Sequence, residues 1–258
     1  FEGGAQIAPD APGGWRTVAP SAVPHGESDA PPAALDAAGM TKAIADFALA
    51  AERSARLGID GIEVHMAHGY LLHQFLSPVA NRRDDEYGGP IEGRMRFPLE
   101  VFRAVRAAFP AERPVWVRVS ASDWVEGGIS IEDIIALGHA LEAAGCAAMH
   151  VSSGGVAAAQ KIPVGPGYQV HLAKAARAAL DMPIIAVGLI TEPEQAEAII
   201  ANGEADAIAL ARALLWNPRW PWHAAAALGA EVRAPKQYWR SAPADVTPPF
   251  IGLVHGQR

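Results

Sequence analysis

Three features of the sequence predict an α/β fold of the (β/α)8-barrel (TIM barrel) class, of which this chain supplies about the last five β/α units. Short apolar strands alternate five times with helical segments, a pattern that requires parallel strands joined by helical crossovers. Polar or catalytic side chains stand at the carboxyl end of every expected strand, where barrel enzymes place their active sites. The Gly-x-Gly-x-x-Gly turn of an open dinucleotide-binding sheet is absent. Because five strands cannot close a barrel, we expect three further strands before Phe1.

The expected elements follow one another in a regular order after a loop-rich start. Residues 1–40 carry turn residues without an apolar period, so we expect loop there. Helices are expected to begin near residues 41, 92, 130, 170 and 191. The expected strands are 62–65, 115–119, 147–151, 184–188 and 207–210. We therefore divide the chain into a loop-rich segment (1–40), the barrel units (41–228) and a C-terminal tail (229–258).

Local signals mark where several of these helices begin and end. Ser130 with Asp133, and Thr191 with Glu194, have the spacing of N-cap pairs, in which side-chain oxygens accept from the first backbone N–H groups. The expected helix stops are Gly58, Gly145 and Asn202-Gly203.

The bulk composition narrows the class of protein. A formal net charge of -7 without a basic block argues against binding to nucleic acid or to an anionic membrane surface. No apolar run reaches the length of a membrane span. A single cysteine, Cys146, excludes an intramolecular disulfide, so a reducing cytoplasm is the expected compartment.

The strongest chemical signal is the segment from His65 to Tyr70. His65 and His68 lie three residues apart, so both face the barrel mouth only if the strand turns near Met66, and Gly69 makes such a turn easy. Two imidazoles can then donate hydrogen bonds to a carbonyl or an anion, and the Tyr70 phenol can deliver a proton. A lone histidine is more often a satisfied core residue, but three such groups within six residues favour a functional site.

A metal site is the alternative interpretation of the histidines, with His65, His68 and His73 as ligands. The helical His-Glu-x-x-His pattern is absent, and no carboxylate stands beside the pair at ligand spacing. A site without metal is therefore the favoured prediction.

Two further features suit a phosphate-bearing cofactor. Gly188 follows the fourth strand and Arg212 the fifth, and the loops after the last two barrel strands commonly bind phosphate. Arg118 lies inside an otherwise apolar strand, where a guanidinium needs a buried anionic or electron-rich partner. That partner is either a ligand or a carboxylate from a neighbouring strand, and spacing alone leaves both open.

The segment from His65-Met66-Ala67-His68-Gly69-Tyr70 through Ser77-Pro78 to Tyr87-Gly88-Gly89 closely resembles the Old Yellow Enzyme family. Val117-Arg118-Val119-Ser120 and Pro166-Gly167-Tyr168-Gln169-Val170 look like the thermophilic-type branch of that family. The similarity runs from the opening Glu2-Gly3-Gly4 to about Arg240. Members of the family are FMN-dependent, NAD(P)H-consuming ene-reductases on the β/α-barrel fold.

The resemblance implies a role for each site residue. His65 and His68 would hold the substrate carbonyl, and Tyr70 would donate the proton. Arg118 would face the pyrimidine edge of the flavin, while the phosphate would bind to Gly188, Ala211 and Arg212. Ala211 departs from the family's usual glycine, which a contact through the backbone N–H tolerates.

The resemblance also implies partners. The substrate would be a small α,β-unsaturated carbonyl compound, and the protein would be a homodimer or homotetramer. In this branch the tail similar to Gln237-Tyr238-Trp239-Arg240 extends an arginine into a neighbouring subunit's site, which would be Arg240. Two other functions stay open from the sequence: a metal-dependent barrel hydrolase, and a non-catalytic fragment lacking N-terminal flavin contacts.

Overall fold

A single parallel sheet of five strands organises the protein, which a computed structural model describes for residues 6–243 and 245–253. The strands lie in sequence order and are β3 (Ile62–Met66), β4 (Val115–Ser120), β5 (Met149–Ser152), β6 (Ile184–Ala186) and β7 (Ala207–Ile208). Within the described ranges β3 and β7 each have one partner, so the sheet is an open arc. The motif Glu2-Gly3-Gly4 lies outside these ranges.

The register of the sheet places chemically important residues in one row. His65 pairs with Arg118, and Arg118 pairs in turn with His150. The row continues through Ile185 to Ala207. Because all strands run in the same direction, the residues that follow this row emerge together at the carboxyl edge of the sheet.

The two faces of the sheet differ in polarity. One face is buried against helices and carries Val64, Met66, Val117, Val119, Met149, Val151 and Ile184. The alternate positions form the other face and include Glu63, His65, Trp116, Arg118 and His150. Trp116 Nε1 donates a 2.6 Å hydrogen bond to Glu63 Oε2, which also lies 3.0 Å from His150 Nδ1. This polar face is the one that would line a barrel interior.

Helices connect the strands and cover the apolar face. In α4, Phe97, Val101 and Val105 recur every four residues and are fully or almost fully buried. The helices are α1 (Ala37–Arg56), α2 (Leu71–Leu76), α3 (Ile91–Arg94), α4 (Arg96–Ala108), α5 (Ile131–Ala143), α6 (Val170–Ala179), α7 (Pro193–Ala201), α8 (Arg212–Trp216) and α9 (Trp220–Ala227), with a 3-10 turn η1 at Lys236–Tyr238.

In the described part of the loop-rich segment, residues 6–40, the structure adds two short strands and an earlier helix start to the expected loop. Two short strands, β1 (Val18–Ala19) and β2 (Ala33–Ala34), pair in parallel. Helix α1 begins at Ala37 rather than near Thr41, because Asp36 Oδ1 accepts a 2.7 Å hydrogen bond from the Gly39 N–H. Short pairs of this kind leave no alternating pattern in the sequence.

Other boundaries shift by a few residues. The expected helix near 92–109 is interrupted at Met95, which separates α3 from α4. Strand β5 begins two residues later than expected, at Met149, and β7 ends at Ile208. At the amino end of β5 the backbone still hydrogen-bonds to β4, since the Ala147 N–H donates to the Val115 carbonyl at 2.9 Å.

Of the two expected N-caps, one is confirmed and one is wrong. Ser130 Oγ accepts from the Asp133 N–H, and the Asp133 carboxylate accepts from the Ser130 N–H, forming a capping box. Thr191 does not cap α7, because its hydroxyl donates to Glu192 Oε1 at 3.0 Å. The N-cap residue is Glu192, and Pro193 occupies the first turn, where its missing N–H leaves no unsatisfied donor.

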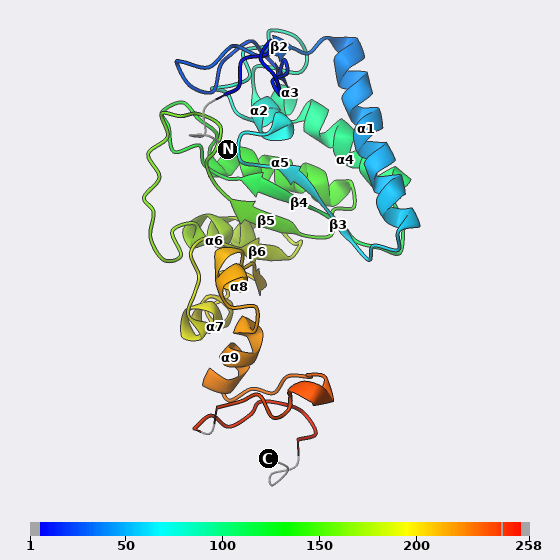
Figure 1. The fold of residues 1–258 in the computed structure, drawn as a ribbon. Helices are drawn as coiled ribbons and strands as arrows, with labels where there is room; N and C mark the ends of the chain where they lie inside the picture. The colour runs from blue at the N-terminus through cyan, green and yellow to red at the C-terminus, as the bar shows by residue number, and fades with distance from the viewer. Residues whose placement is uncertain (1–5, 244, 254–258) are drawn as a thin grey trace.

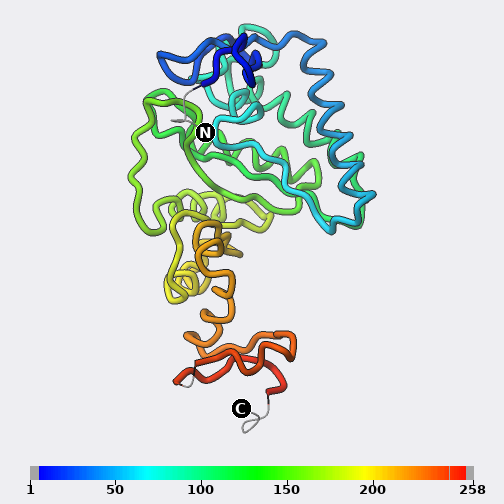
Figure 2. Tube along the Cα trace, viewed as in Figure 1, coloured from blue at the N-terminus to red at the C-terminus, as the bar shows by residue number. Residues whose placement is uncertain are grey.

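The C-terminal part of the chain extends away from the sheet. Figure 1 shows α8, α9 and the following segment leading to the opposite end of the molecule from the N-terminal loops. Figure 2 traces the same path. The N-terminal loops lie against α2, which contacts β1. No helix in the described part of the chain is long and apolar enough to cross a membrane.

Candidate functional site

The chain turns sharply at the carboxyl end of β3, as the sequence predicts. Strand β3 ends at Met66, and His68 and Gly69 follow with φ angles of 56° and 75°. The turn brings the ring centroids of His65 and His68 to 5.2 Å, and those of His65 and Tyr70 also to 5.2 Å. The three predicted groups therefore form one cluster. Tyr70 is its exposed member, with 62% of the residue accessible.

Backbone packing holds this turn against the loop that follows β5. The His68 N–H donates to Ser120 Oγ at 3.0 Å, and the Ser120 hydroxyl donates to the Gly154 carbonyl at 2.9 Å. A Cβ on Gly155 would lie 2.5 Å from the His68 carbonyl carbon, and a Cβ on Gly69 would lie 2.0 Å from the Gly155 oxygen. Only glycine permits this approach of two backbones.

Left-handed backbone is concentrated at the carboxyl ends of the strands. Among the described residues, the non-glycine residues with positive φ are His68, Trp124 and Leu189. They follow β3, β4 and β6 respectively. Such conformations are disfavoured for residues with a Cβ, and they cluster at functional sites where surrounding structure enforces them.

A hydrogen-bond network connects His68 to the turn after β6. His68 Nε2 lies 2.6 Å from Ser152 Oγ, which is itself 3.4 Å from Gln169 Oε1. Ser153 donates to the same Gln169 oxygen at 2.6 Å, and Gln169 Nε2 donates to the Val187 carbonyl at 3.0 Å. Sequence reasoning missed Ser153 and Gln169 as site residues, although Gln169 stands in the quoted Pro166–Val170 motif.

Arg118 and His65 each keep an unsatisfied buried nitrogen. Arg118 Nε and His65 Nδ1 have no hydrogen-bond partner, and no carboxylate in the described part of the chain lies within 4.0 Å of Arg118. Glu63 is a carboxylate on the neighbouring strand β3, but it contacts His150 and Trp116 instead. Burial lowers the pKa of Arg118, and the attraction of Glu63 partly offsets this. An unpaired cation of this kind suits an electron-rich ligand.

One cavity of about 410 Å³ joins Arg118 and His68 to the expected phosphate loops, whereas His65 and Tyr70 are not among its lining residues. Its walls include His68 and Arg118 on one side and Gly188, Ala211 and Arg212 on the other. Gly188 has φ 129°, and a Cβ there would lie 2.8 Å from Gln169 Nε2, so glycine is required. Arg212 has no hydrogen-bond or ion-pair partner among the described residues.

The histidines are held neutral. The pKa of His68 is lowered to about 4, mainly by burial and secondarily by the positive charge of Arg118. Burial and Arg118 also lower the pKa of His65, against a smaller opposing effect of Glu63. At neutral pH each ring therefore carries one N–H donor and one acceptor.

His73 does not join a metal site with the other two histidines. Its side chain is fully buried, with Nδ1 accepting from the Gly69 N–H at 2.9 Å and Nε2 lying 2.9 Å from Asp123 Oδ1. Nδ1 is thus hydrogen-bonded within the protein, and Nε2 lies at ion-pair distance from a carboxylate oxygen, although this contact does not have hydrogen-bond geometry. In the part of the chain that the structure describes, no three His, Cys, Asp or Glu residues are grouped to hold a metal ion.

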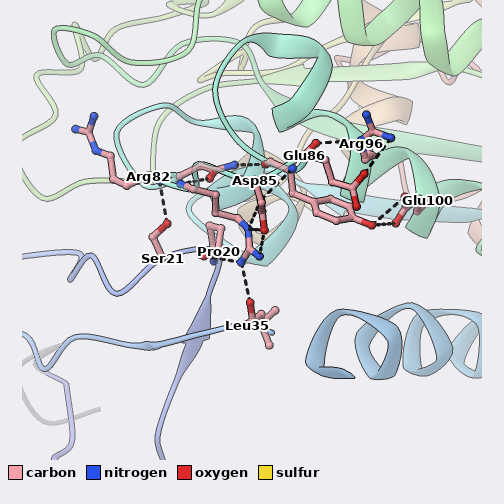
Figure 3. Close-up of polar contacts among 11 residues, drawn as sticks. Pro20, Ser21, Leu35, Arg82, Asp85, Glu86, Arg96 and Glu100 are labelled. Atoms are coloured by element: carbon pink, nitrogen blue, oxygen red, sulfur yellow. Dashed lines mark hydrogen bonds and ion pairs between the residues drawn. The ribbon is translucent and has the colours of Figure 1, made fainter. Parts of the chain in front are cut away.

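The segment from Asn81 to Tyr87 anchors the N-terminal loops. Arg83 Nη1 donates to the carbonyls of Pro20 and Leu35 at 3.0 and 2.7 Å, and the guanidinium also pairs with Asp85 (Figure 3). The Arg82 N–H donates to Ser21 Oγ at 2.9 Å. This part of the family-like motif is therefore structural.

Arg240 lies apart from the cluster of its own chain. It is exposed, and it stands in the C-terminal segment that extends away from the sheet (Figure 1). The geometry therefore gives it no contact with His65 or Tyr70 within one chain.

The residues present fit an anionic ring-bearing cofactor. Arg118 Nε is a buried donor without a hydrogen-bond partner. Arg212 is a cation without an ion-pair partner among the described residues, and Gly188 lines the same cavity without filling it with a side chain. Fold and cavity together indicate a β/α enzyme that holds such a cofactor at the carboxyl ends of its strands.

The chain belongs to the NADH:flavin oxidoreductase / NADH oxidase family, whose sequence pattern matches residues 8–231. This match confirms the resemblance found in the sequence and includes the site residues other than Arg240. The chain is 44% identical over 224 residues to an NADPH dehydrogenase of Listeria innocua serovar 6a, covering 87% of this chain and 65% of that protein. An NADPH dehydrogenase of Geobacillus thermodenitrificans is 44% identical over 223 residues, 86% of this chain and 65% of the relative.

Solved structures share the fold. A 2-naphthoyl-CoA reductase in complex with 2-naphthoyl-CoA superposes with a TM-score of 0.73 and 27% identity, over 81% of this chain and 32% of that one. Morphinone reductase in complex with tetrahydroNAD gives a TM-score of 0.68 and 30% identity, over 87% of this chain and 63% of that one. The fold is thus the expected β/α barrel, in part. The chain spans about 65% of the length of its curated relatives.

Proposed function

We propose that this protein is an FMN-dependent NAD(P)H oxidoreductase that reduces the activated C=C bond of α,β-unsaturated carbonyl compounds. The observation that carries the proposal is the shared cavity, because it joins His68 and Arg118 to Gly188 and Arg212. Membership of a flavin oxidoreductase family supports the cofactor and the coarser activity. The names of the curated relatives, NADPH dehydrogenases, support a nicotinamide nucleotide as reductant.

Each wall of the cavity would hold one part of the cofactor. Arg118 would face the electron-rich edge of the flavin ring and supply the missing partner for its buried Nε. Gly188, Ala211 and Arg212 would hold the phosphate, with the Arg212 guanidinium placed to form two parallel hydrogen bonds. When bound, FMN supplies hydride transfer, which no protein side chain can perform.

The two histidines would hold and polarise the substrate carbonyl. Because both pKa values are lowered, each ring binds as a neutral donor rather than as a cation. The Ser152 hydroxyl lies 2.6 Å from His68 Nε2 and 3.4 Å from Gln169 Oε1, and we propose that it donates over the shorter contact to His68. The His68 proton would then sit on Nδ1, available to the carbonyl oxygen. A preplaced donor of this type is typically worth about 3 kcal/mol of barrier.

Tyr70 would donate the proton to the α-carbon. Tyr70 is the exposed member of the cluster, with 62% of the residue accessible, so a substrate can reach it from solution. The ring stays oriented by its contact with His65 at 5.2 Å. A phenol is a competent general acid when it lies within hydrogen-bond reach of the reacting carbon.

The proposal extends to the assembly and the cellular setting. Arg240 would reach the substrate site of a neighbouring subunit, because the segment after α9 to which it belongs leads away from the sheet of its own chain (Figure 1). The protein would then be a homodimer or homotetramer. A reducing cytoplasm is the proposed compartment, since one buried cysteine, Cys146, serves no disulfide.

The experiment that tests this function separates the two half-reactions in the protein loaded with FMN. Stopped-flow absorbance measures how fast NADPH bleaches the flavin and how fast a cyclic enone restores its colour. His65→Ala and His68→Ala should retain FMN but slow enone turnover by about 10²-fold. Tyr70→Phe should slow only the enone half-reaction, since it removes a proton donor and keeps the ring. Wild-type enone turnover in all three variants would overturn the assignment.

A further inference from the structure

We propose that the buried pair His73–Asp123 is a positioning device that orients the Gly69 peptide and thereby sets His68 and Tyr70. The catalytic consequence rests on the proposed function, but the positioning itself can be tested without cofactor or substrate. Neither residue touches the cavity that joins His68 to Arg212. Both are almost completely inaccessible, with exposed fractions of 0% for His73 and 1% for Asp123.

The contacts of His73 define its tautomer. The Gly69 N–H donates to Nδ1 at 2.9 Å, so Nδ1 must be the acceptor of the ring. The ring proton therefore sits on Nε2, which lies 2.9 Å from Asp123 Oδ1. If the proton were on Nδ1, two donors, Nδ1–H and the Gly69 N–H, would face each other. If the Asp123 carboxyl were neutral, Nε2 would lose its negatively charged partner.

Asp123 is fixed in turn by its other oxygen. Oδ2 accepts from the Ser77 hydroxyl at 2.6 Å and from the Ile129 N–H at 2.8 Å. Burial by itself would raise the pKa of Asp123, but the contacts with His73, Ser77 and the Ile129 N–H outweigh it and lower the pKa. The carboxylate is thus ionised at neutral pH, and Oδ1 is left for His73.

The two backbone polar groups of Gly69 are held by consecutive residues of α2: its N–H belongs to the His68–Gly69 peptide unit and its carbonyl to the Gly69–Tyr70 unit. His73 accepts from its N–H, and Gln74 Nε2 donates to its carbonyl at 2.7 Å. Gly69 stands between His68 and Tyr70, and both His68 and Gly69 have positive φ. Rotation of the His68–Gly69 unit would redirect the His68 side chain, and rotation of the Gly69–Tyr70 unit would redirect that of Tyr70. The buried pair therefore determines where the imidazole and the phenol point.

Asp123→Asn tests the tautomer with little change in shape. If the Asn amide faces His73, two donors oppose each other, and the ring must move its proton to Nδ1 and release the Gly69 N–H. If the Asn oxygen faces His73, the amide instead opposes the Ile129 N–H. Histidine 15N NMR of the cofactor-free protein distinguishes the protonated from the unprotonated Nδ1. We expect an unprotonated His73 Nδ1 in the wild type. In Asp123→Asn we expect either the other His73 tautomer or a loss of protection of the Ile129 N–H from hydrogen exchange.

Substitutions of His73 test the link to Gly69. His73→Asn keeps an acceptor near the Nδ1 position, whereas His73→Leu removes it. Hydrogen exchange of the Gly69 amide should accelerate at least about tenfold in His73→Leu, because a buried donor loses its partner, and by less in His73→Asn. Gly145→Ala is the control for lost stability alone, since Gly145 has φ 81° and no atom within 4 Å of an added Cβ.

The outcomes separate positioning from the proposed activity. In the FMN-loaded protein, Asp123→Asn and His73→Leu should lower kcat for enone reduction by about tenfold or more with a smaller change in KM, while Gly145→Ala keeps kcat. A wild-type His73 protonated at Nδ1, or unchanged Gly69 exchange in His73→Leu, would overturn the positioning role. A wild-type protein without enone turnover would overturn the proposed function and leave the NMR result to decide this inference.

Discussion

Replacing Gly155 by alanine should displace the turn that carries His68 while leaving the rest of the fold in place. An added Cβ would lie 2.5 Å from both the Cα and the carbonyl carbon of His68, whereas ordinary contacts begin at 3.4 Å. Relief of the clash needs a separation of about 0.9 Å (3.4 − 2.5), because both neighbours are backbone. A misplacement of about 1 Å in a catalytic group can cost about 10²-fold in rate.

The matched control is Gly145→Ala. Gly145 also has positive φ, 81° against 100° for Gly155, but an added Cβ there meets no atom within 4 Å. Both substitutions should lower the free energy of unfolding by about 1–2 kcal/mol through backbone strain. Only Gly155→Ala should also lower enone turnover, by about 10²-fold, with FMN still bound.

The assay combines urea denaturation, which measures unfolding, with steady-state NADPH oxidation in the presence of an enone. Equal turnover in the two variants would refute the reasoning, because the close approach of Gly155 to His68 would then have no influence on the site. Turnover is expressed per bound FMN, because Gly155 also lines the cavity to which the cofactor is assigned.

Two further predictions follow from the electrostatics and from the N-terminal anchor. The pKa of His68 in the folded protein is about 4, below the usual 6.5, so the unfolded chain binds the proton more readily. The free energy of unfolding should therefore fall as the pH drops from about 6.5 to 4. An NMR titration that gives a pKa above 6 for His68 in the cofactor-free protein would contradict this prediction. Arg83→Ala should accelerate hydrogen exchange in residues 17–35 by removing donors to Pro20 and Leu35. Arg82→Ala, whose bond to Ser21 comes from the backbone N–H, should not (Figure 3).

Local sequence signals were sufficient for much of the architecture. The alternation of strands and helices predicts the five parallel strands, and the Ser130–Asp133 pair predicts the start of α5, because periodicity and capping act over a few residues. The pairing of His65 and His68 across a turn follows from the same local reasoning, since Gly69 and the end of β3 lie within the motif itself.

Contacts between distant segments were not predictable in this way. Asp123 meets Ser77 across 46 positions, and Ser152 meets His68 across 84. Such pairs depend on strand order and on the direction of each loop, which one sequence does not report. The Thr191 cap failed for a different, local reason: the hydroxyl donates to the carboxylate of the adjacent Glu192. Gly188 and Arg212 line one cavity, in agreement with the barrel rule for the loops after the last two strands, and their role in holding a phosphate stays a prediction.

The central claim is that the cavity between Arg118 and Arg212 binds FMN through its phosphate, and a comparison of FMN with riboflavin tests it most directly. Quenching of flavin fluorescence gives the Kd of each ligand for the wild type, for Arg212→Ala and for the surface control Arg177→Ala, whose guanidinium pairs with Asp206. The wild type and Arg177→Ala should bind FMN roughly 10- to 100-fold more tightly than riboflavin, the range expected for charge-assisted bonds to the phosphate. In Arg212→Ala that preference should shrink to a few-fold while the riboflavin Kd stays the same. A preference for FMN that survives the loss of Arg212 would contradict the claim.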